Sequence, residues 1–257
     1  MSALHFSSLK LMSQSPLHFR HHLDNPTVCT PAMRIGTAVH RLILGGELPP
    51  IFDGTRRGAA WEAFKARYEK PDEILSQGEM DKAINIAEGA KGHPNLIASL
   101  LGAEFEVPLE WEMNGIHCAT RGIDIQLQTC HRDLKTCRTV QPDRLLRDCE
   151  QRLYHAQLAW YEIGREVKHG FKRTAPHSLV CVESSPPYDV VIVEMSDAMI
   201  ESGKSACFKW FEEYCVCASS NSWPGYTNAP LIMEPRVQFE AEEDNEESDD
   251  SREEITE

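Results

Sequence analysis

The chain has 257 residues and a formal net charge of −14 at pH 7, and this length is enough to bury a full hydrophobic core in one large domain. No apolar run reaches the roughly eighteen residues of a transmembrane helix, and the N-terminal residues lack the basic segment and apolar stretch of a secretory signal. The nine cysteines are an odd number without any C-x₂-C pair, which argues for reduced thiols in the cytosol and against a zinc or iron–sulfur cluster.

The N-terminal part of the chain is expected to be helical. Capping residues and prolines predict short helices from about Ser7 and from Pro16, and a longer helix from Pro31 to a stop at Gly45-Gly46. The remaining segments here are a loop over residues 47–58 and helices over 59–68, 73–90 and 95–101.

Strands and helices alternate in the second part of the chain. Alternating apolar residues predict strands over 104–113 and 116–128, joined by Asn114-Gly115, a type I′ hairpin sequence. The segments that follow are a strand over 132–137, a helical region over 141–168 in one or two pieces, a hairpin of strands 178–183 and 189–194, and a helix over 196–218. This order predicts an α/β fold in which helices flank a central mixed β-sheet.

The negative charge is concentrated at the C-terminus. Residues 240–257 contain eleven Asp or Glu and one Arg, a contribution of −10, so the rest of the chain carries about −4. A segment this acidic and this poor in apolar residues is expected to be disordered. We therefore predict a single domain over 1–235 and an acidic tail over 236–257, which either keeps the chain soluble or mimics the charge of DNA.

Two aspartates and a lysine lie in one predicted hairpin. If its turn is centred between Gln128 and Thr129, Asp124 and Asp133 are equidistant from the turn and lie opposite each other. Because side chains alternate along a strand, Lys135 then shares a face with Asp133.

This set suits metal-dependent phosphodiester chemistry. Mg²⁺ prefers carboxylate, carbonyl and water oxygens, and it can polarise a phosphate and lower the pKa of a bound water. A neighbouring lysine can orient or deprotonate that water or stabilise charge on the phosphorane. Taken alone, the three residues also fit a surface hairpin with a cross-strand charge cluster.

Two helical motifs flank this hairpin in the sequence. His40, in Gly36-Thr37-Ala38-Val39-His40, is either a core histidine or a nitrogen ligand, and the ligand role would add tolerance of Mn²⁺. The small residues before it would let the helix approach the sheet closely. Tyr154, Gln157 and Tyr161 share one helix face, which is either an aromatic packing stripe or a surface that contacts the phosphodiester backbone and supports the lysine.

Arginines are frequent near these motifs. Phosphate contacts commonly come from such residues, although many arginines are simply solvated. The arginines concerned are Arg34, Arg121, Arg138, Arg144, Arg147 and Arg152, of which Arg34 and Arg121 are chosen as candidates for binding DNA phosphate.

Four motifs in one order resemble the RecE-like (exonuclease VIII) nuclease domain of the PD-(D/E)xK superfamily. They are Gly36-Thr37-Ala38-Val39-His40, Arg121-Gly122-Ile123-Asp124, Asp133-Leu134-Lys135-Thr136 and Tyr154-His155-Ala156-Gln157-Leu158-Ala159-Trp160-Tyr161. The resemblance extends from the Ser7 region to Trp223-Pro224. One departure is Ile123, which stands where the superfamily name places proline.

The resemblance implies a Mg²⁺-dependent exonuclease that degrades one strand of duplex DNA from its 5′ end and leaves a 3′ overhang. It also implies double-stranded DNA ends as the substrate, a RecT-like single-strand annealing protein as partner, a toroidal homo-oligomer for which a tetramer is one candidate, and a cytoplasmic location in a bacterial or phage-infected cell. By family role, His40, Asp124, Asp133 and the Leu134 carbonyl would bind the metal and Lys135 would be catalytic. The supporting residues would be Gln157 and Tyr161, and the candidate DNA contacts are Arg34, Arg121, Thr136 and Tyr154.

Three other functions remain open at this point. One is a RecB-like nuclease of different polarity or single-strand preference. The second is a catalytically inactive DNA-binding module on the same fold, against which the presence of His40, Asp124, Asp133 and Lys135 argues. The third is an acidic scaffold with no DNA role.

Overall fold

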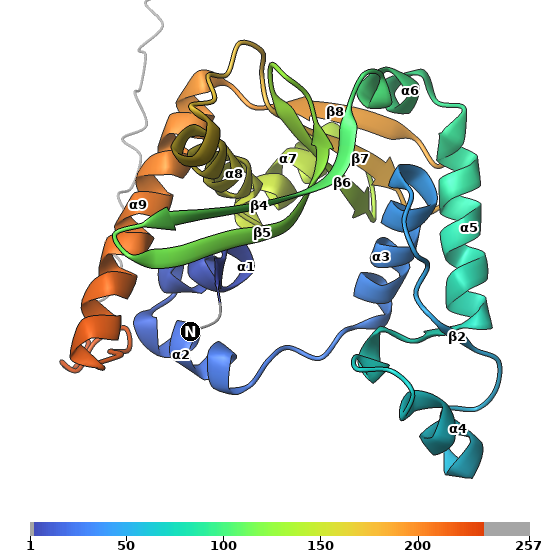
Figure 1. Ribbon diagram of the computed structural model, residues 1–257, viewed down its shortest axis with the longest axis horizontal. Coiled ribbons are helices and arrows are strands. Elements are labelled where there is room, and N and C mark those ends of the chain that lie inside the picture. The colour runs from blue at the N-terminus through green and yellow to red at the C-terminus, as the bar shows by residue number, and fades with distance from the viewer. Residues whose placement is uncertain (1–2, 234–257) are drawn as a thin grey trace, which may run out of the picture. The chain divides into compact units, whose positions relative to one another are not determined.

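A mixed six-stranded β-sheet lies at the centre of the residues described by the computed structural model, 3–233 (Figure 1). Its path is β1-β5-β6-β7-β8, and β4 pairs with the other edge of β5. The pairs β1/β5 and β6/β7 are parallel, whereas β4/β5, β5/β6 and β7/β8 are antiparallel. The strands are β1 (Leu4–His5), β4 (Glu104–Met113), β5 (Ile116–Gln126), β6 (His131–Cys137), β7 (Ser178–Glu183) and β8 (Val190–Glu194).

Helices cover both faces of this sheet (Figure 1). Alternate residues of β7 show the two layers, because Val180 and Val182 pack with α3 and α5, whereas Leu179 and Cys181 pack with α7 and α8. A third cluster joins β4 and β5 to α1, α8 and α9, with Trp160 fully buried. The helices are α1 (Phe6–Leu9), α2 (Pro16–Asp24), α3 (Pro31–Leu44), α4 (Gly58–Lys65), α5 (Gln77–Lys91), α6 (Pro94–Leu100), α7 (Pro142–Gln151), α8 (Tyr154–His169) and α9 (Asp197–Ser220).

Local sequence explains most of these boundaries. Ser15 and Thr30 cap α2 and α3 with their hydroxyl oxygens, and proline occupies the first turn of each helix. Asn114 and Gly115 have the positive φ angles, 47° and 74°, that the predicted hairpin turn requires. Leu153, at φ 59°, separates α7 from α8 and so decides that the helical region has two pieces.

The predicted α/β architecture is confirmed, and the differences concern very short strands. β1 pairs with β5 over two residues, and β2 (Ile51–Phe52) pairs in parallel with β3 (Leu75–Ser76), where a loop and the start of a helix were expected. Two-residue strands are too short to show a periodicity.

Of the described residues, 3–226 form one compact unit, which holds all the elements named above. The predicted acidic tail over 236–257 lies outside the described residues, so the proposed domain boundary stays a prediction. Among residues 3–233, the structure contains no helix long and apolar enough to cross a membrane.

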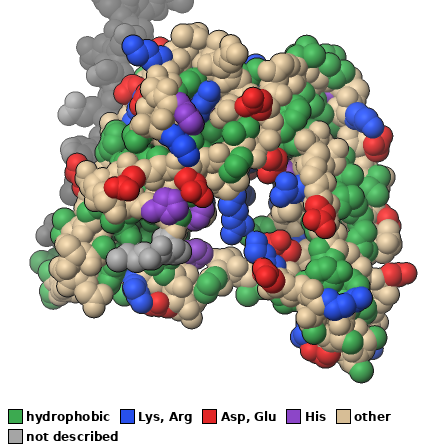
Figure 2. All heavy atoms as spheres, viewed as in Figure 1, with side chains coloured by type: hydrophobic (Ala, Val, Ile, Leu, Met, Phe, Trp, Pro, Cys, Tyr) green, Lys and Arg blue, Asp and Glu red, His purple; other side chains and the backbone are tan. Residues whose placement is uncertain are grey.

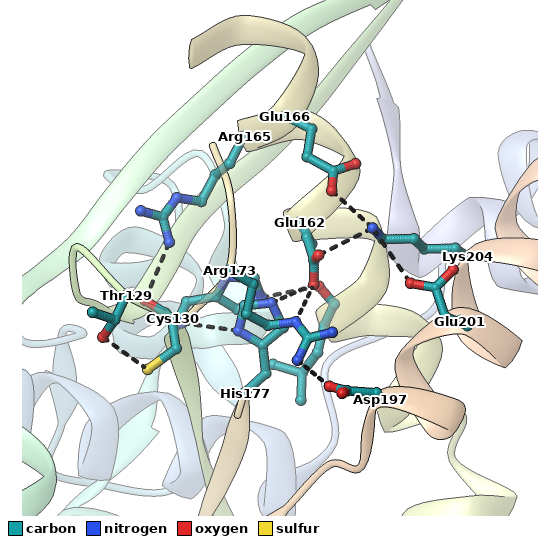
Figure 3. A network of polar contacts seen from close by, with 12 residues as sticks. Thr129, Cys130, Glu162, Arg165, Glu166, Arg173, His177, Asp197, Glu201 and Lys204 are labelled. Carbon is teal, nitrogen blue, oxygen red and sulfur yellow. Dashed lines mark hydrogen bonds and ion pairs between the residues drawn. The ribbon is translucent and has the colours of Figure 1, made fainter. Parts of the chain in front are cut away.

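A buried charge network ties α8 to the start of β6 (Figure 3). The Glu162 carboxylate accepts hydrogen bonds from Arg173 at 3.0 Å and from His177 Nε2 at 2.7 Å, and Lys204 Nζ lies 3.0 Å away. His177 Nδ1 accepts the backbone N–H of His131, the first residue of β6. Burial alone would raise the pKa of Glu162, but hydrogen bonds from His177 and Lys204 outweigh it and hold the carboxyl ionised.

We expect Glu162→Gln to lower the free energy of unfolding by about 3 kcal/mol, because it removes the buried carboxylate that Arg173 and Lys204 share. These two part-buried cations would keep only the exposed carboxylates of Asp197 and Glu166. Glu166→Gln is the matched control: Glu166 also contacts Lys204 but its side chain is 40% exposed, and exposed pairs contribute less than about 1 kcal/mol. Denaturant unfolding of both variants measures the difference, and equal losses would contradict a structural role for Glu162.

Candidate active site

A cleft of about 710 Å³ lies among α3, β4, β5, β6, α7 and the start of α8. Figure 2 shows basic, acidic and histidine side chains gathered around the hollowed middle of the face between the β4–β5 strands and α3. The residues that line the cleft include His40, Glu106, Asp124, Lys135 and Tyr154. The structure therefore brings side chains from both helical motifs and from the hairpin to one place.

The hairpin has the register that the sequence predicts. β5 and β6 pair at Ile125 with Arg132 and at Gln126 with His131, and one further step places Asp124 opposite Asp133. At this point a side chain takes the place of a backbone carbonyl as hydrogen-bond acceptor. The Asp124 Oδ2 accepts the backbone N–H of Leu134 at 2.8 Å. The side chain thus fixes β6 where the two strands begin to separate.

Asp124 belongs to a cluster with His40 and Glu106. His40 Nδ1 lies 3.6 Å from Asp124 Oδ2, and one atom of each of the three side chains lies within 4.8 Å of the others. Burial, followed by the charge of Lys135, lowers the pKa of His40 to about 4. The imidazole is therefore neutral at neutral pH, with a lone pair free to bind a cation. Burial and the nearby Asp133 raise the pKa of Asp124.

Glu106 is the residue of this cluster that the sequence analysis missed. In β4, Phe105 pairs with Ile125 and Val107 with Ile123, so Glu106 lies opposite Asp124. Counting back from the Asn114-Gly115 turn would instead place Phe105 there. A bulge makes the difference, because two β5 residues, Arg121 and Gly122, face the single residue Pro108.

Two residues of the sequence carry the signal for this bulge. Proline within a strand is typical of a bulge or an edge, because it has no N–H to donate, and Pro108 occupies that position. Gly122 leaves the space that the bulge needs: a Cβ there would lie 3.0 Å from the backbone of Glu106, which has a φ of 52°.

The second carboxylate is held by Lys135 and Gln157. Lys135 Nζ forms an ion pair with Asp133 Oδ2, and Gln157 Nε2 donates to Asp133 Oδ1 at 3.1 Å and to the Tyr161 hydroxyl at 2.6 Å. Burial alone would lower the pKa of Lys135, but the charges of Asp133 and Asp124 outweigh it and raise the pKa. Lys135 is therefore a cation in this arrangement, and its ammonium lies 4.8 Å from the centre of the Tyr154 ring.

Residues 5–231 match the sequence model of a family described as "PDDEXK-like domain of unknown function (DUF3799)". The chain belongs to this family. Membership of the PD-(D/E)xK superfamily, predicted from the four motifs, is thereby confirmed, and so is the fold class. Among curated proteins, none matches the sequence at a significant level.

A solved structure agrees with the fold of this DUF3799 domain. The crystal structure of a "Putative exonuclease" from Eubacterium rectale aligns with a TM-score of 0.62 and 12% sequence identity over 91% of this chain and 90% of its own. A likeness at this identity shows a common fold. The crystal structure of SSO0001 aligns with 14% identity over 88% of this chain and 98% of its own, but with a TM-score of 0.27.

Arg34 of the DUF3799 domain requires a correction. It is 8% exposed, and its guanidinium donates from Nε and Nη2 to Glu79 and from Nη1 to the carbonyls of Cys29 and Asp72. All three of its nitrogens are thus engaged: two join α3 to α5 through Glu79, and the third binds backbone carbonyls outside both helices. We therefore withdraw Arg34 from the candidate DNA contacts.

The other predicted contacts lie on the cleft wall. Arg121 is exposed there, and Thr136 and Tyr154 line it. The backbone of Leu134 lies beside the cluster, because its N–H donates to the Asp124 carboxylate. Gly36 permits the close approach of α3 to the sheet that the small residues predict, because a Cβ there would lie 3.3 Å from Thr136 Oγ1.

Proposed function

We propose that this DUF3799 domain is a metal-dependent exodeoxyribonuclease that degrades one strand of linear duplex DNA from the 5′ end and leaves a 3′ single-stranded overhang. The observation that carries the proposal is one cleft in which His40, Glu106 and Asp124 cluster beside the Asp133–Lys135 ion pair. The PD-(D/E)xK family assignment supports nuclease chemistry. The four-motif resemblance supports action at a DNA end, and the name of the Eubacterium rectale protein, "Putative exonuclease", agrees with exonuclease action.

The cluster fits a divalent cation. Two ligands at about 2.1 Å from one Mg²⁺ can be at most about 4.2 Å apart, and the 3.6 Å between His40 Nδ1 and Asp124 Oδ2 meets this limit. A small shift of Glu106 would complete a site of two carboxylates and a neutral imidazole. We propose Mg²⁺ as the cofactor, with Mn²⁺ tolerated because one ligand is nitrogen. Asp133 and the Leu134 carbonyl remain proposed ligands from the neighbouring strand.

Each residue of the site would then have its own role in the cleavage reaction. A bound cation supplies polarisation of the phosphate and a more acidic water. His40 and Asp124 hold that position, and Leu134 N–H orients the Asp124 carboxylate. Lys135, kept protonated by two carboxylates, stabilises negative charge that develops on the phosphate. Gln157 restrains Asp133, so that Asp133 and Lys135 keep a fixed orientation.

We expect wild-type protein with Mg²⁺ to release label from the 5′ end of a linear duplex before label from the 3′ end. EDTA should abolish the release, and a closed circular duplex of the same sequence is the control that should stay intact. Release of the 3′ label first would favour a RecB-like nuclease of other polarity. Protection of the DNA without any cleavage would favour an inactive binding module.

We further propose a role in phage-type or single-strand-annealing recombination, with a RecT-like annealing protein as partner, a toroidal homo-oligomer as the working form and the cytoplasm as its location. Support for the role, the partner and the oligomer comes from the motif resemblance. The nine cysteines, all free thiols in the structure, fit a reducing compartment.

A further inference from the structure

A second hollow lies beside the active-site cleft. It has a volume of about 370 Å³ and is lined by Arg138, Thr139, Arg144, Arg147 and Asp148. Arg138 and Asp148 also line the cleft, so the two hollows adjoin along these residues. We call this second hollow the α7 arginine hollow.

Helix α7 forms the wall between the two hollows. Leu145, Asp148 and Arg152 face the cleft, whereas Arg144 and Arg147, three residues apart on the adjoining strip of the helix, face the α7 arginine hollow. Leu145 is 2% exposed within a core cluster. This anchoring fixes the helix, and with it the positions from which the arginines project.

The arginines of the hollow have uncompensated charge. Arg138, Arg144 and Arg147 are exposed, and across residues 3–233 none of their guanidinium groups takes part in an ion pair. Asp148, the one acidic residue of the lining, has no ion pair there either. Three positive charges against one negative leave the hollow basic, in a chain whose formal net charge is −14.

The positive field extends into the cleft. Arg152 lies on the wall of the cleft. Burial raises the pKa of the Tyr154 phenol, and the charges of Lys135 and Arg152 both oppose this rise. Positive groups therefore run from Lys135 past Arg152 and Arg138 to the hollow. This path suits a polyanion that passes through the cleft.

Guanidinium groups match phosphate well, because their planar set of donors binds two oxygens at once. Arg144 and Arg147 are separated by about 4.5 Å along the helix axis, and one DNA strand carries a charge every 3.4 Å or so of duplex axis. Side chains as long as arginine can therefore reach successive phosphates from these two positions.

We propose that the α7 arginine hollow binds internal phosphates of a DNA strand that continues out of the active-site cleft. This inference rests on the proposed nuclease function and adds to it the path of the strand. Because the hollow would bind phosphates of the DNA backbone, it would contribute affinity for DNA without preference for a base.

The test compares two doubly substituted proteins that lose the same charge. Arg144→Ala/Arg147→Ala removes the proposed contacts. Lys168→Ala/Lys172→Ala removes two exposed lysines at and beyond the far end of α8, about 20 Å along the helix from Tyr154. Substitution Arg144→Lys/Arg147→Lys retains the charge. Thermal melts of all three confirm folding, which these exposed positions should leave unchanged.

For Arg144→Ala/Arg147→Ala we expect KM for a long linear duplex to rise about tenfold at about 0.15 M salt, with kcat unchanged. The slope of log kcat/KM against log salt should become shallower by about 1 to 2. The lysine control should stay within about twofold of wild type, and the charge-retaining variant should recover most of the loss.

The outcomes separate the two claims. If wild type cleaves DNA and Arg144→Ala/Arg147→Ala matches the lysine control, the hollow does not bind the strand, while the nuclease function stands. If wild type neither binds nor cleaves linear DNA, both claims are wrong. If Arg144→Ala/Arg147→Ala raises KM only for DNA with 5′-phosphorylated ends and not for DNA with 5′-hydroxyl ends, the hollow binds a terminal phosphate. The proposal that it binds internal phosphates would then be wrong.

Discussion

Lys135→Ala should lower kcat on linear duplex DNA by about a thousandfold or more, because it removes the cation closest to the two aspartates. Its ammonium forms the ion pair with Asp133, and the charges of Asp133 and Asp124 keep it protonated. Lys135→Met separates charge from packing, since methionine keeps an unbranched chain of similar length but carries no charge. We expect Lys135→Met to be as inactive as Lys135→Ala.

Lys82→Ala is the matched control, because Lys82 also lines the cleft but is exposed and forms no ion pair within residues 3–233. It should retain kcat within about twofold. Steady-state cleavage at saturating DNA measures kcat for all three variants. If Lys135→Met cleaves within tenfold of wild type, the charge of Lys135 has no direct role in the chemistry.

The sequence predicts the site best where local rules fix geometry. The turn near Gln128-Thr129 sets the register that places Asp124 opposite Asp133, and strand alternation places Lys135 beside them. These relations span few residues, so short-range rules suffice.

The positions of Glu106 and Arg34 could not be predicted from local patterns, because one depends on a β-bulge and the other on a contact between distant segments. Glu106 reaches the site only because the bulge at Gly122 shifts the register of β4 against β5. Arg34 was misassigned because its partner Glu79 lies 45 residues further along the chain, and α3–α5 packing alone brings the two together. Proximity in sequence to a catalytic motif therefore did not indicate access to the cleft.

Asp124→Asn should abolish cation binding and lower cleavage by about a thousandfold or more, because Asp124 belongs to both possible ligand sets. One set, implied by family resemblance, is His40, Asp124, Asp133 and the Leu134 carbonyl. The other is the observed cluster of His40, Glu106 and Asp124. In this structure Asp133 forms an ion pair with Lys135 and accepts a hydrogen bond from Gln157. Glu106 has one longer contact, 3.4 Å to Arg41, which favours Glu106 as the third side chain.

Glu106→Gln and Asp133→Asn distinguish the two sets. If Glu106 is a ligand, Glu106→Gln should weaken Mn²⁺ binding about 10- to 100-fold, because a carboxylate oxygen and its charge are lost. Glu104→Gln, two residues away on β4 and exposed, is the matched control and should leave binding unchanged. Calorimetric titration of Mn²⁺ without DNA measures affinity independently of cleavage. Unaltered affinity in Glu106→Gln, together with lost binding in Asp133→Asn, would assign the metal to the β5–β6 hairpin and leave Glu106 as the partner of Arg41, whose guanidinium lies 3.4 Å from it.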